Sequence, residues 1–335
     1  MVIGYINSKW SMPRRLALIS AVFLIPSLAQ LYLFAENKLK EISAIDREIA
    51  GAKLASAVWA KMSGDKGDRS IGRDSGTLDD AAKTLGVESG IAAFNNAKTQ
   101  SAQVHQGIEL LAQIASASGM ATDSADDSYY AQEVFIQRLS GVKQAVAELH
   151  DTLSSPPTAE DDTNLAVNYA VLLRTNSKLK TALRKLVEQD ASGEIKRALD
   201  DTPAQLVGKL DSIASQIKVA DYRRTAIGND IQSSLADADV MIGTAAGATG
   251  AVFLQLAEKH AAADASSLYW TLGILIAATI LAIVMVALIS KGTSHRLSDL
   301  VRTMEQLSHK DLSVSIPHLT DTNENGKIAA ALSRF

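Results

Sequence analysis

The stretch LYWTLGILIAATILAIVMVALIS, residues 268–290, is predominantly apolar and contains no charged side chain. A helix needs about 20 consecutive apolar residues to cross the ~30 Å hydrocarbon layer of a membrane, and this stretch is long enough. A buried core helix of a soluble protein is the alternative, but uncharged apolar runs of this length are rare in soluble folds. We therefore predict a transmembrane helix over residues 268–290.

A second uncharged apolar run, LALISAVFLIPSLAQLYLFA, covers residues 16–35. Basic residues precede it, and the segment PSLA that starts at Pro26 resembles the cleavage region of a signal peptide, so a cleaved leader is one alternative. The apolar character continues through Phe34, beyond that region. We therefore expect an uncleaved transmembrane helix over residues 16–35.

The charges that flank the two runs predict the orientation of the chain. Residues 1–15 contain three basic and no acidic side chains, and Lys291, His295 and Arg296 follow the second run. Basic residues concentrate on the cytoplasmic side of membrane helices, so both termini are expected in the cytoplasm. Residues 36–267 then form an external domain, with 32 acidic and 24 basic residues and a net charge of −8. Such a domain is not suited to binding nucleic acid.

The composition favours an all-α fold. Apolar residues make up 47% of the chain but aromatic residues only 5%, so the core consists mainly of Ala, Leu, Ile and Val, and only six prolines occur. Apolar residues recur at helical spacing in six segments of the external domain, and we call each such row of residues a seam. The six seams predict six antiparallel helices. A four-helix bundle uses roughly 100–150 residues, so two stacked bundles fit this domain better. The seams cover residues 42–59, 91–111, 135–153, 165–186, 206–217 and 231–256.

Helix starts and breaks are also marked in the external domain. Thr158, with Asp161 three residues later, predicts the start of the fourth helix, and Thr202-Pro203 predicts the start of the fifth. The Gly/Ser/Asp-rich residues 63–76 and the Pro156-Pro157 pair predict breaks.

Two features within the seams have alternative interpretations. Asn176 is a polar residue in the fourth seam. Its side chain either fixes the register in which the helices of the bundle pack together or binds a ligand. In the last seam Gly243, Gly247 and Gly250 replace bulky residues, which predicts close packing of a neighbouring helix rather than a ligand site.

No catalytic machinery is visible in the sequence. The six histidines are isolated, the chain has no cysteine, and the HExxH, GxGxxG, GxxxxGK[ST] and GxSxG patterns are absent. We therefore expect no catalytic residues, metal ligands or cofactor in these residues.

The most distinctive external stretch is ATDSADDSYYAQEVF, residues 121–135. Counting back from the seam of the third helix at 100° per residue places Ser128 on the seam and Tyr129 and Tyr130 on either side of it. The tyrosines either wedge the junction between bundles or line a pocket for a small polar ligand. In the second case arginines could pair with a ligand carboxylate. The candidate ligand-binding residues are Asp127, Tyr129, Tyr130, Arg138 and Arg174.

Residues 291–335 combine a short amphipathic helix, an extended connector and a second helix start at Glu324-Asn325-Gly326. This order directly behind a membrane span resembles a HAMP domain, the parallel two-helix linker of bacterial transmembrane receptors. Lys310 stands where the family commonly has glycine, and Leu297 stands where it has proline. The resemblance implies signal transmission by Leu297, Leu300, Met304, Leu307, Leu312, Ile316, Glu324, Gly326, Ile328 and Leu332.

The external domain also resembles a family. Residues 118–149 are similar to the Asp-Ser-Tyr-Tyr segment of helical sensor domains in methyl-accepting chemotaxis proteins and related sensor kinases, and residues 39–54 fit the same group. The resemblance implies a periplasmic sensor in the bacterial inner membrane. A homodimer is expected, because a HAMP core is made from two chains.

The sequence therefore predicts a chemoreceptor-type sensor with a cytoplasmic tail (1–15), two membrane helices (16–35 and 268–290), a periplasmic domain (36–267) and an incomplete HAMP domain (291–335). It would detect a small molecule, or a periplasmic binding protein, and act on cytoplasmic signalling proteins through an output domain beyond residue 335. The input half of a histidine kinase or nucleotide cyclase is the main alternative, and a structural membrane tether is the other.

Overall fold

The computed structural model of the chain describes residues 12–63, 76–122, 126–155, 158, 160–190, 193–309, 313–321 and 324–334. All regular elements in these ranges are helices, which confirms the all-α fold. Residues 1–11 of the predicted cytoplasmic tail lie outside the described residues, as do Leu312 and the side chains of Asp127 and Glu324.

The chain divides into two compact units. The first, called the bundle unit here, is Lys40–Ala265, and the second, the flanking unit, combines Met1–Leu39 with Ser266–Phe335. These divisions lie near the sequence-based boundaries at residues 36 and 267, which remain predictions. Two long helices, α2 (Met12–Met62) and α11 (Asn229–Ser308), contribute residues to both units.

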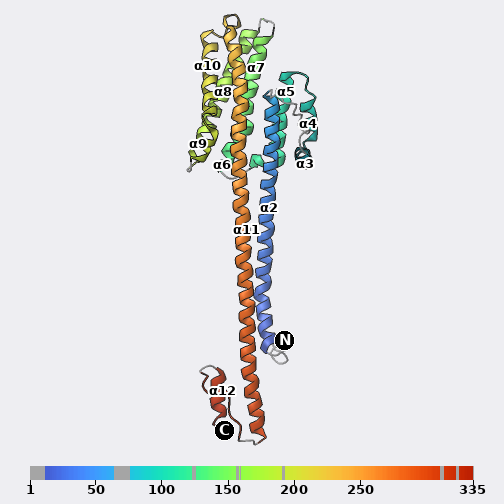
Figure 1. The fold of residues 1–335 in the computed structure, drawn as a ribbon, viewed down its shortest axis with the longest axis vertical. Coiled ribbons are helices and arrows are strands. Elements are labelled where there is room, and N and C mark those ends of the chain that lie inside the picture. Colours follow the sequence, from blue (N-terminus) through green and yellow to red (C-terminus); the bar gives the residue numbers. More distant parts are fainter. Residues whose placement is uncertain are drawn as a thin grey trace. The chain divides into compact units, whose positions relative to one another are not determined.

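The remaining helices of the bundle unit lie between α2 and α11 in the chain (Figure 1). Short 3-10 turns, η1 (Met120–Thr122) and η3 (Arg224–Ala226), join some of them, and η2 (Glu133–Arg138) is a π-helical segment. The α-helices are α3 (Gly76–Leu85), α4 (Glu88–Asn95), α5 (Gln100–Ser118), α6 (Asp126–Gln132), α7 (Leu139–Ser154), α8 (Asp161–Glu188), α9 (Glu194–Leu199) and α10 (Thr202–Val219).

Five of the six predicted external helices are present as continuous helical segments, and one prediction is wrong. The seam over residues 91–111 belongs to two helices, α4 and α5, because Thr99 caps the start of α5 by accepting a hydrogen bond from the N–H of Ala102 at 3.2 Å. Helix α5 ends at Ser118, and Gly119 directly after it has φ +90°, the conformation typical of a glycine that ends a helix. The helices α3 and α9 were not predicted.

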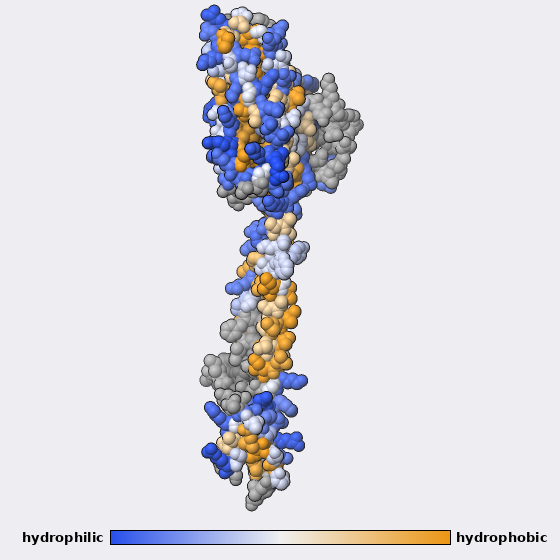
Figure 2. Space-filling view, turned by 60° about the vertical axis from the view of Figure 1, so that its left-hand side comes forward, coloured by the Kyte–Doolittle hydropathy of each residue, from blue (hydrophilic) through white to orange (hydrophobic). Residues whose placement is uncertain are grey.

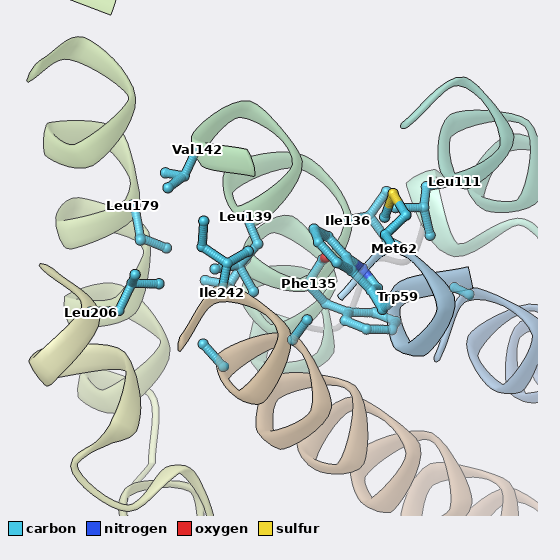
Figure 3. Close-up of a cluster of buried hydrophobic side chains, with 14 of the residues drawn as sticks. Trp59, Met62, Leu111, Phe135, Ile136, Leu139, Val142, Leu179, Leu206 and Ile242 are labelled. Atoms are coloured by element: carbon cyan, nitrogen blue, oxygen red, sulfur yellow. The ribbon is translucent and has the colours of Figure 1, made fainter. Parts of the chain in front are cut away.

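The core of the bundle unit is one contiguous cluster of buried apolar side chains. Helix α8 packs between α7 and α10, and side chains of α11 reach both α7 and α10 (Figure 1). In the close-up, Leu139 and Val142 of α7 approach Leu179 of α8 and Leu206 of α10, with Ile242 of α11 nearby (Figure 3). A division into two stacked bundles stays a prediction.

An unpredicted junction joins α2, η2 and α11. In the π-helical segment the N–H of Leu139 bonds to the carbonyl of Val134, five residues earlier, instead of the usual four. The carbonyl of Phe135 accepts a hydrogen bond from the indole N–H of Trp59 in α2, at 3.1 Å. The Phe135 ring lies against Gly250 of α11, so three segments meet around these two aromatic side chains (Figure 3).

The glycines of α11 pack as predicted at two of three positions. A Cβ on Gly250 would lie 2.8 Å from the Phe135 ring, and one on Gly243 would collide with Ser63, but one on Gly247 meets nothing within 4 Å. Gly250→Ala is expected to destabilise the bundle, because overpacking against a fully buried ring costs about 1–3 kcal/mol and outweighs the ~1 kcal/mol gained in helix propensity.

Gly247→Ala is the matched control, because it brings the same gain in helix propensity without a contact. It should stabilise the protein by roughly 0.5–1 kcal/mol. Urea denaturation of the detergent-solubilised chain, followed by circular dichroism, measures both variants. Two shifts of the same sign would contradict close packing at Gly250.

The turn before α8 is held by Asp161 and Arg224. The carboxylate of Asp161 accepts hydrogen bonds from the hydroxyl of Thr158 at 2.5 Å and from its N–H at 3.1 Å, and it pairs with Nε of Arg224 at 2.9 Å. Thr158 is bonded to Asp161, but the prediction that Thr158 caps the helix is wrong, because α8 begins at Asp161 with Glu160 as the residue before it. Arg224 also donates to the carbonyls of Thr152 and Ser155 at the end of α7.

These contacts predict an acid-sensitive contribution to stability. The Thr158 hydroxyl, its backbone N–H and the charge of Arg224 together hold the pKa of Asp161 below its ordinary value. Because the folded pKa is the lower one, the contribution is fully present above the ordinary carboxyl pKa and is lost as the pH falls through the folded pKa. The stability difference between the native chain and Asp161→Asn should therefore be constant from pH 7 to pH 5 and shrink below about pH 4. Urea midpoints at each pH measure it, and a difference that grows in acid would contradict the assignment.

The apolar part of α11 lies in the flanking unit. Among the described residues α11 is the one helix that is long and apolar enough to cross a membrane, and none of its apolar window is buried. Figure 2 shows hydrophobic atoms gathered along this stretch. Helix α2 is continuous over residues 16–35, and large side chains such as Ile25 and Tyr32 are exposed there. A second membrane crossing by α2 stays a prediction.

The C-terminal part of the flanking unit folds back on α11. Helix α12 (Glu324–Leu332) buries Ala329 and Leu332 against Leu300, and Leu307 and Ile316 pack on this small cluster. Leu300 and Leu332, two of the residues that the HAMP resemblance singled out, thus lie in one cluster. Two other predicted seam residues, Met304 and Ile328, are 47% and 38% exposed, and Ala329 lies in the contact instead.

Candidate functional site

The predicted tyrosine site lies on α6, where it meets α8. Ser128 is buried, Tyr129 is exposed and Tyr130 is half-buried, which confirms that the seam passes through Ser128 with a tyrosine on each side. The two rings make an edge-to-face contact with centroids 5.3 Å apart. Nζ of Lys185 on α8 lies 5.3 Å from the centroid of the Tyr130 ring, a distance typical of a cation–π contact.

The predicted arginines do not join the tyrosines. Nε of Arg138 donates to Oε1 of Glu133 at 2.8 Å, so the charge of Arg138 is already neutralised within the π-helical segment. Arg174 is exposed on α8. Among the described residues, neither arginine makes a hydrogen bond or a cation–π contact with Tyr129 or Tyr130, and Asp127 is described only by its backbone. The ligand role of these five residues stays a prediction.

A larger cavity opens between α8, α9 and α10, and we call it the α9 cavity. Its volume is about 930 Å³, which lies within the range of pockets that hold small molecules. Most of its inner surface is apolar. The apolar side chains come from all three helices: Leu183, Val187, Leu199, Pro203, Ala204 and Val207.

The formation of this cavity depends on the short helix α9. Gly193, in the left-handed conformation with φ +70° and ψ +13°, precedes α9, and Asp200, with φ +50° and ψ −158°, follows it. Two residues with positive φ therefore turn the chain into and out of the helix. A positive φ at a residue other than glycine costs free energy and is common at functional sites. Ile195 and Leu199 are buried, which anchors α9 to the bundle.

Six charged side chains surround the apolar lining, three of each sign. The cations are Lys180, Lys196 and Arg197, and the carboxylates are Asp200, Asp201 and Asp211. The structure shows no ion pair for any of these six among the residues it describes. Two have hydrogen bonds: Nε of Arg197 donates to the carbonyl of Gly193 at 3.0 Å, and Asp211 accepts from Asn176 at 2.7 Å.

Asn176 connects the cavity to the core. Its side chain is 4% exposed, and its Nδ2 donates to Oδ1 of Asp211 and to the carbonyl of Val207 at 3.4 Å, both of which line the cavity. Its Oδ1 is buried and has no hydrogen-bond partner in the structure. Asn176 itself is not among the residues that line the cavity, so the unpaired acceptor lies behind the lining, at a cost of about 1–3 kcal/mol. This position favours the register interpretation of Asn176 over direct ligand binding.

A second cavity, of about 280 Å³, lies between α5, α7 and α11. Asp239 lines it and accepts a hydrogen bond from Lys143, whose side chain is completely buried behind the wall. This cavity is small for an organic ligand, and its charged groups serve the packing of α7 on α11. Sequence reasoning missed both cavities, because each depends on side chains from three helices.

Comparison with known proteins adds no identification: no protein-family model, curated protein or solved structure matches the chain. No group of three or more residues that could hold a metal ion is present in the described part of the chain.

Proposed function

We propose that this chain is a transmembrane sensor of the bacterial chemoreceptor type. The bundle unit lies outside the inner membrane and binds a small molecule. The signal passes through the apolar segment of α11 to the HAMP-like element and on to cytoplasmic signalling proteins. The apolar part of α2 forms the other membrane crossing, and both termini lie in the cytoplasm.

The main observation behind this proposal is that one helix, α11, contains a core segment of the bundle unit, then an apolar segment, then a segment that packs on α12. Within the bundle unit it contributes core residues such as Leu235 and Ile242, which are almost fully buried. Its following segment is apolar and exposed, as expected for lipid contact. Its last turns bury Leu300 against α12. A helix that packs in a ligand-binding bundle and ends in a linker can carry a small slide or rotation between them.

The HAMP-like element supports a homodimer. In a single chain its buried cluster contains only Leu300, Ala329 and Leu332, while Met304 and Ile328 remain exposed. A second copy would cover these apolar side chains in a parallel bundle. Gly326 also fits this element, because a Cβ there would collide with the carbonyl of Asp321.

Signalling requires two packings of the bundle that differ in ligand affinity. A ligand that binds one packing better shifts the population toward it, and the shift cannot exceed the difference in binding free energy. A difference of a few kcal/mol in the binding free energy of the ligand to the two packings therefore suffices to shift α11 from one position to the other.

Cysteine labelling tests the membrane arrangement, and the chain suits it because it has no native cysteine. Val219→Cys lies at an 85% exposed position of the bundle unit, and Val301→Cys lies at a 55% exposed position after the apolar segment. In spheroplasts a membrane-impermeant maleimide should label Val219→Cys directly but Val301→Cys only after lysis. Equal labelling of both variants before lysis would overturn the proposal.

A further inference from the structure

We propose that the α9 cavity binds a zwitterionic small molecule with an apolar body. This inference deepens the proposed function and rests on it, because it assigns the ligand-binding site of the sensor and the chemistry of the ligand. The site is separate from the tyrosine junction on α6, and none of the residues singled out there lines it.

The apolar lining of the α9 cavity predicts that the ligand has an apolar body. Leu183, Val187 and Ala204 line a hollow of about 930 Å³ and are half-buried or exposed in the free protein. A ligand that covers them removes apolar surface from water, which is the main source of affinity in pockets of this kind. A fully polar ligand would leave this lining exposed.

The charged side chains around the cavity indicate which polar groups the ligand has. Three cationic and three anionic side chains surround the hollow, and they make no ion pairs with one another. A ligand with only one sign of charge would gain three attractions and meet three repulsions. A zwitterion can place its carboxylate near Lys196 and Arg197 and its ammonium near the aspartates, so both sets of charges gain a partner.

Asn176 holds one of the carboxylates at the cavity. Its Nδ2 donates to Oδ1 of Asp211 at 2.7 Å, and Asp211 lines the cavity whereas Asn176 does not. This hydrogen bond keeps Asp211 beside the hollow, where it can pair with an ammonium group of the ligand.

Three apolar dipeptides, leucyl-leucine, leucyl-phenylalanine and valyl-leucine, are suitable probes because each joins an apolar body to both terminal charges. Titration calorimetry with the full chain in lipid nanodiscs should detect binding of at least one of them. The N-acetylated form of that dipeptide, which is only anionic, and its C-terminal amide, which is only cationic, should each bind at least about tenfold more weakly. No binding of any dipeptide, or equal binding of the blocked forms, would overturn the inference.

The structure offers a variant that closes the cavity without disturbing the core. Gly208 lines the cavity on α10, is exposed, and has open space around the position of a Cβ. Gly208→Trp should fill the hollow and abolish binding, whereas Ser215→Trp, at an exposed position of the same helix outside the cavity, should leave it unchanged. Retained binding in Gly208→Trp would place the ligand elsewhere and overturn the assignment.

Removal of one carboxylate from the cavity tests the charge pairing with the ligand, independently of the variant that fills the cavity. Asp200→Asn keeps the size of the side chain and removes one carboxylate from the cavity. It should weaken binding of the free dipeptide several-fold and leave the N-acetylated form, which has no ammonium, unaffected or slightly tighter. Equal weakening of both forms would contradict a role for Asp200 in pairing the ammonium.

The binding result and the labelling result are separable. Dipeptide binding combined with equal labelling of Val219→Cys and Val301→Cys would uphold the site and overturn the transmembrane sensor. The expected labelling without binding of any probe would overturn the site and leave the membrane arrangement intact.

Discussion

Replacement of Trp59 by alanine is expected to destabilise the bundle unit by about 3–5 kcal/mol, the usual cost of removing a large aromatic side chain from a core. Trp59 is 1% exposed and is among the largest fully buried side chains. Its loss would also leave the carbonyl of Phe135 without its indole donor, at a place where the π-helical segment already departs from regular bonding. Urea denaturation of the solubilised chain, followed by circular dichroism at 222 nm, an ordinary helix wavelength, measures the change.

Trp59→Phe separates the two contributions. It keeps an aromatic ring but removes the indole N–H together with part of the ring volume, so about 1–2 kcal/mol should be lost, close to the value of one buried hydrogen bond plus a small packing defect. A loss in Trp59→Phe as large as in Trp59→Ala would mean that burial of the remaining ring adds no stability. A change below about 1 kcal/mol in Trp59→Ala would contradict the packed junction of α2, η2 and α11.

The helices of the bundle unit could be predicted because each has a continuous seam. Leu165, Leu172, Leu179 and Leu186 recur every seven residues along α8, and all are fully buried. That spacing follows from the 3.6-residue period of the helix alone and needs no knowledge of the partners. The same reasoning explains why Ser128 could be placed on a seam.

Short elements and register changes could not be predicted in this way. Helix α9 has six residues, fewer than two turns, so no period can be recognised in it. No feature of the apolar sequence pattern marks the π-helical segment, and the indole that donates to its Phe135 carbonyl belongs to Trp59, 76 residues earlier. The break between α4 and α5 was signalled by Thr99, a preferred capping residue, but the seam on both sides concealed it.

The α9 cavity could not be predicted from the sequence, because a pocket depends on which helices become neighbours. The tyrosines were chosen because they do not belong to the seam, and they lie on a helix surface rather than around the larger cavity. Asn176 was noticed as a polar residue in a seam. Its unpaired oxygen and its contact with Asp211 appear only when α8 and α10 are placed together.

Lys143 shows the limit of pattern reading within a helix. It lies next to the seam residue Val142 on α7, where an amphipathic pattern would place it in solvent. In the structure its side chain is completely buried, and Nζ donates to the carbonyl of Met62 at 3.0 Å and to Oδ1 of Asp239 at 2.5 Å. The ammonium thus lies at the C-terminal end of α2, where the helix dipole favours a positive charge.

Lys143→Met is therefore expected to cost about 3 kcal/mol, at the lower end of the range for breaking a buried ion pair. Methionine fills most of the space of the lysine stem, so the loss reports the missing charge rather than a cavity. The lower end applies because Asp239 is 24% exposed and can regain some hydration when its partner is removed. Urea denaturation of the full chain, followed by circular dichroism, measures the change.

A double-mutant cycle with Asp239→Leu isolates the pairing from the packing. Each single variant leaves one polar group unpaired, whereas Lys143→Met combined with Asp239→Leu removes both charges and replaces them with apolar side chains. Because such double replacements of buried pairs are often neutral, the double variant should be more stable than Lys143→Met alone, with a coupling energy of about 1–3 kcal/mol. Additive losses would show that Lys143 and Asp239 act independently, and α2 would then be held to α7 and α11 by apolar packing and the bond to Met62 alone.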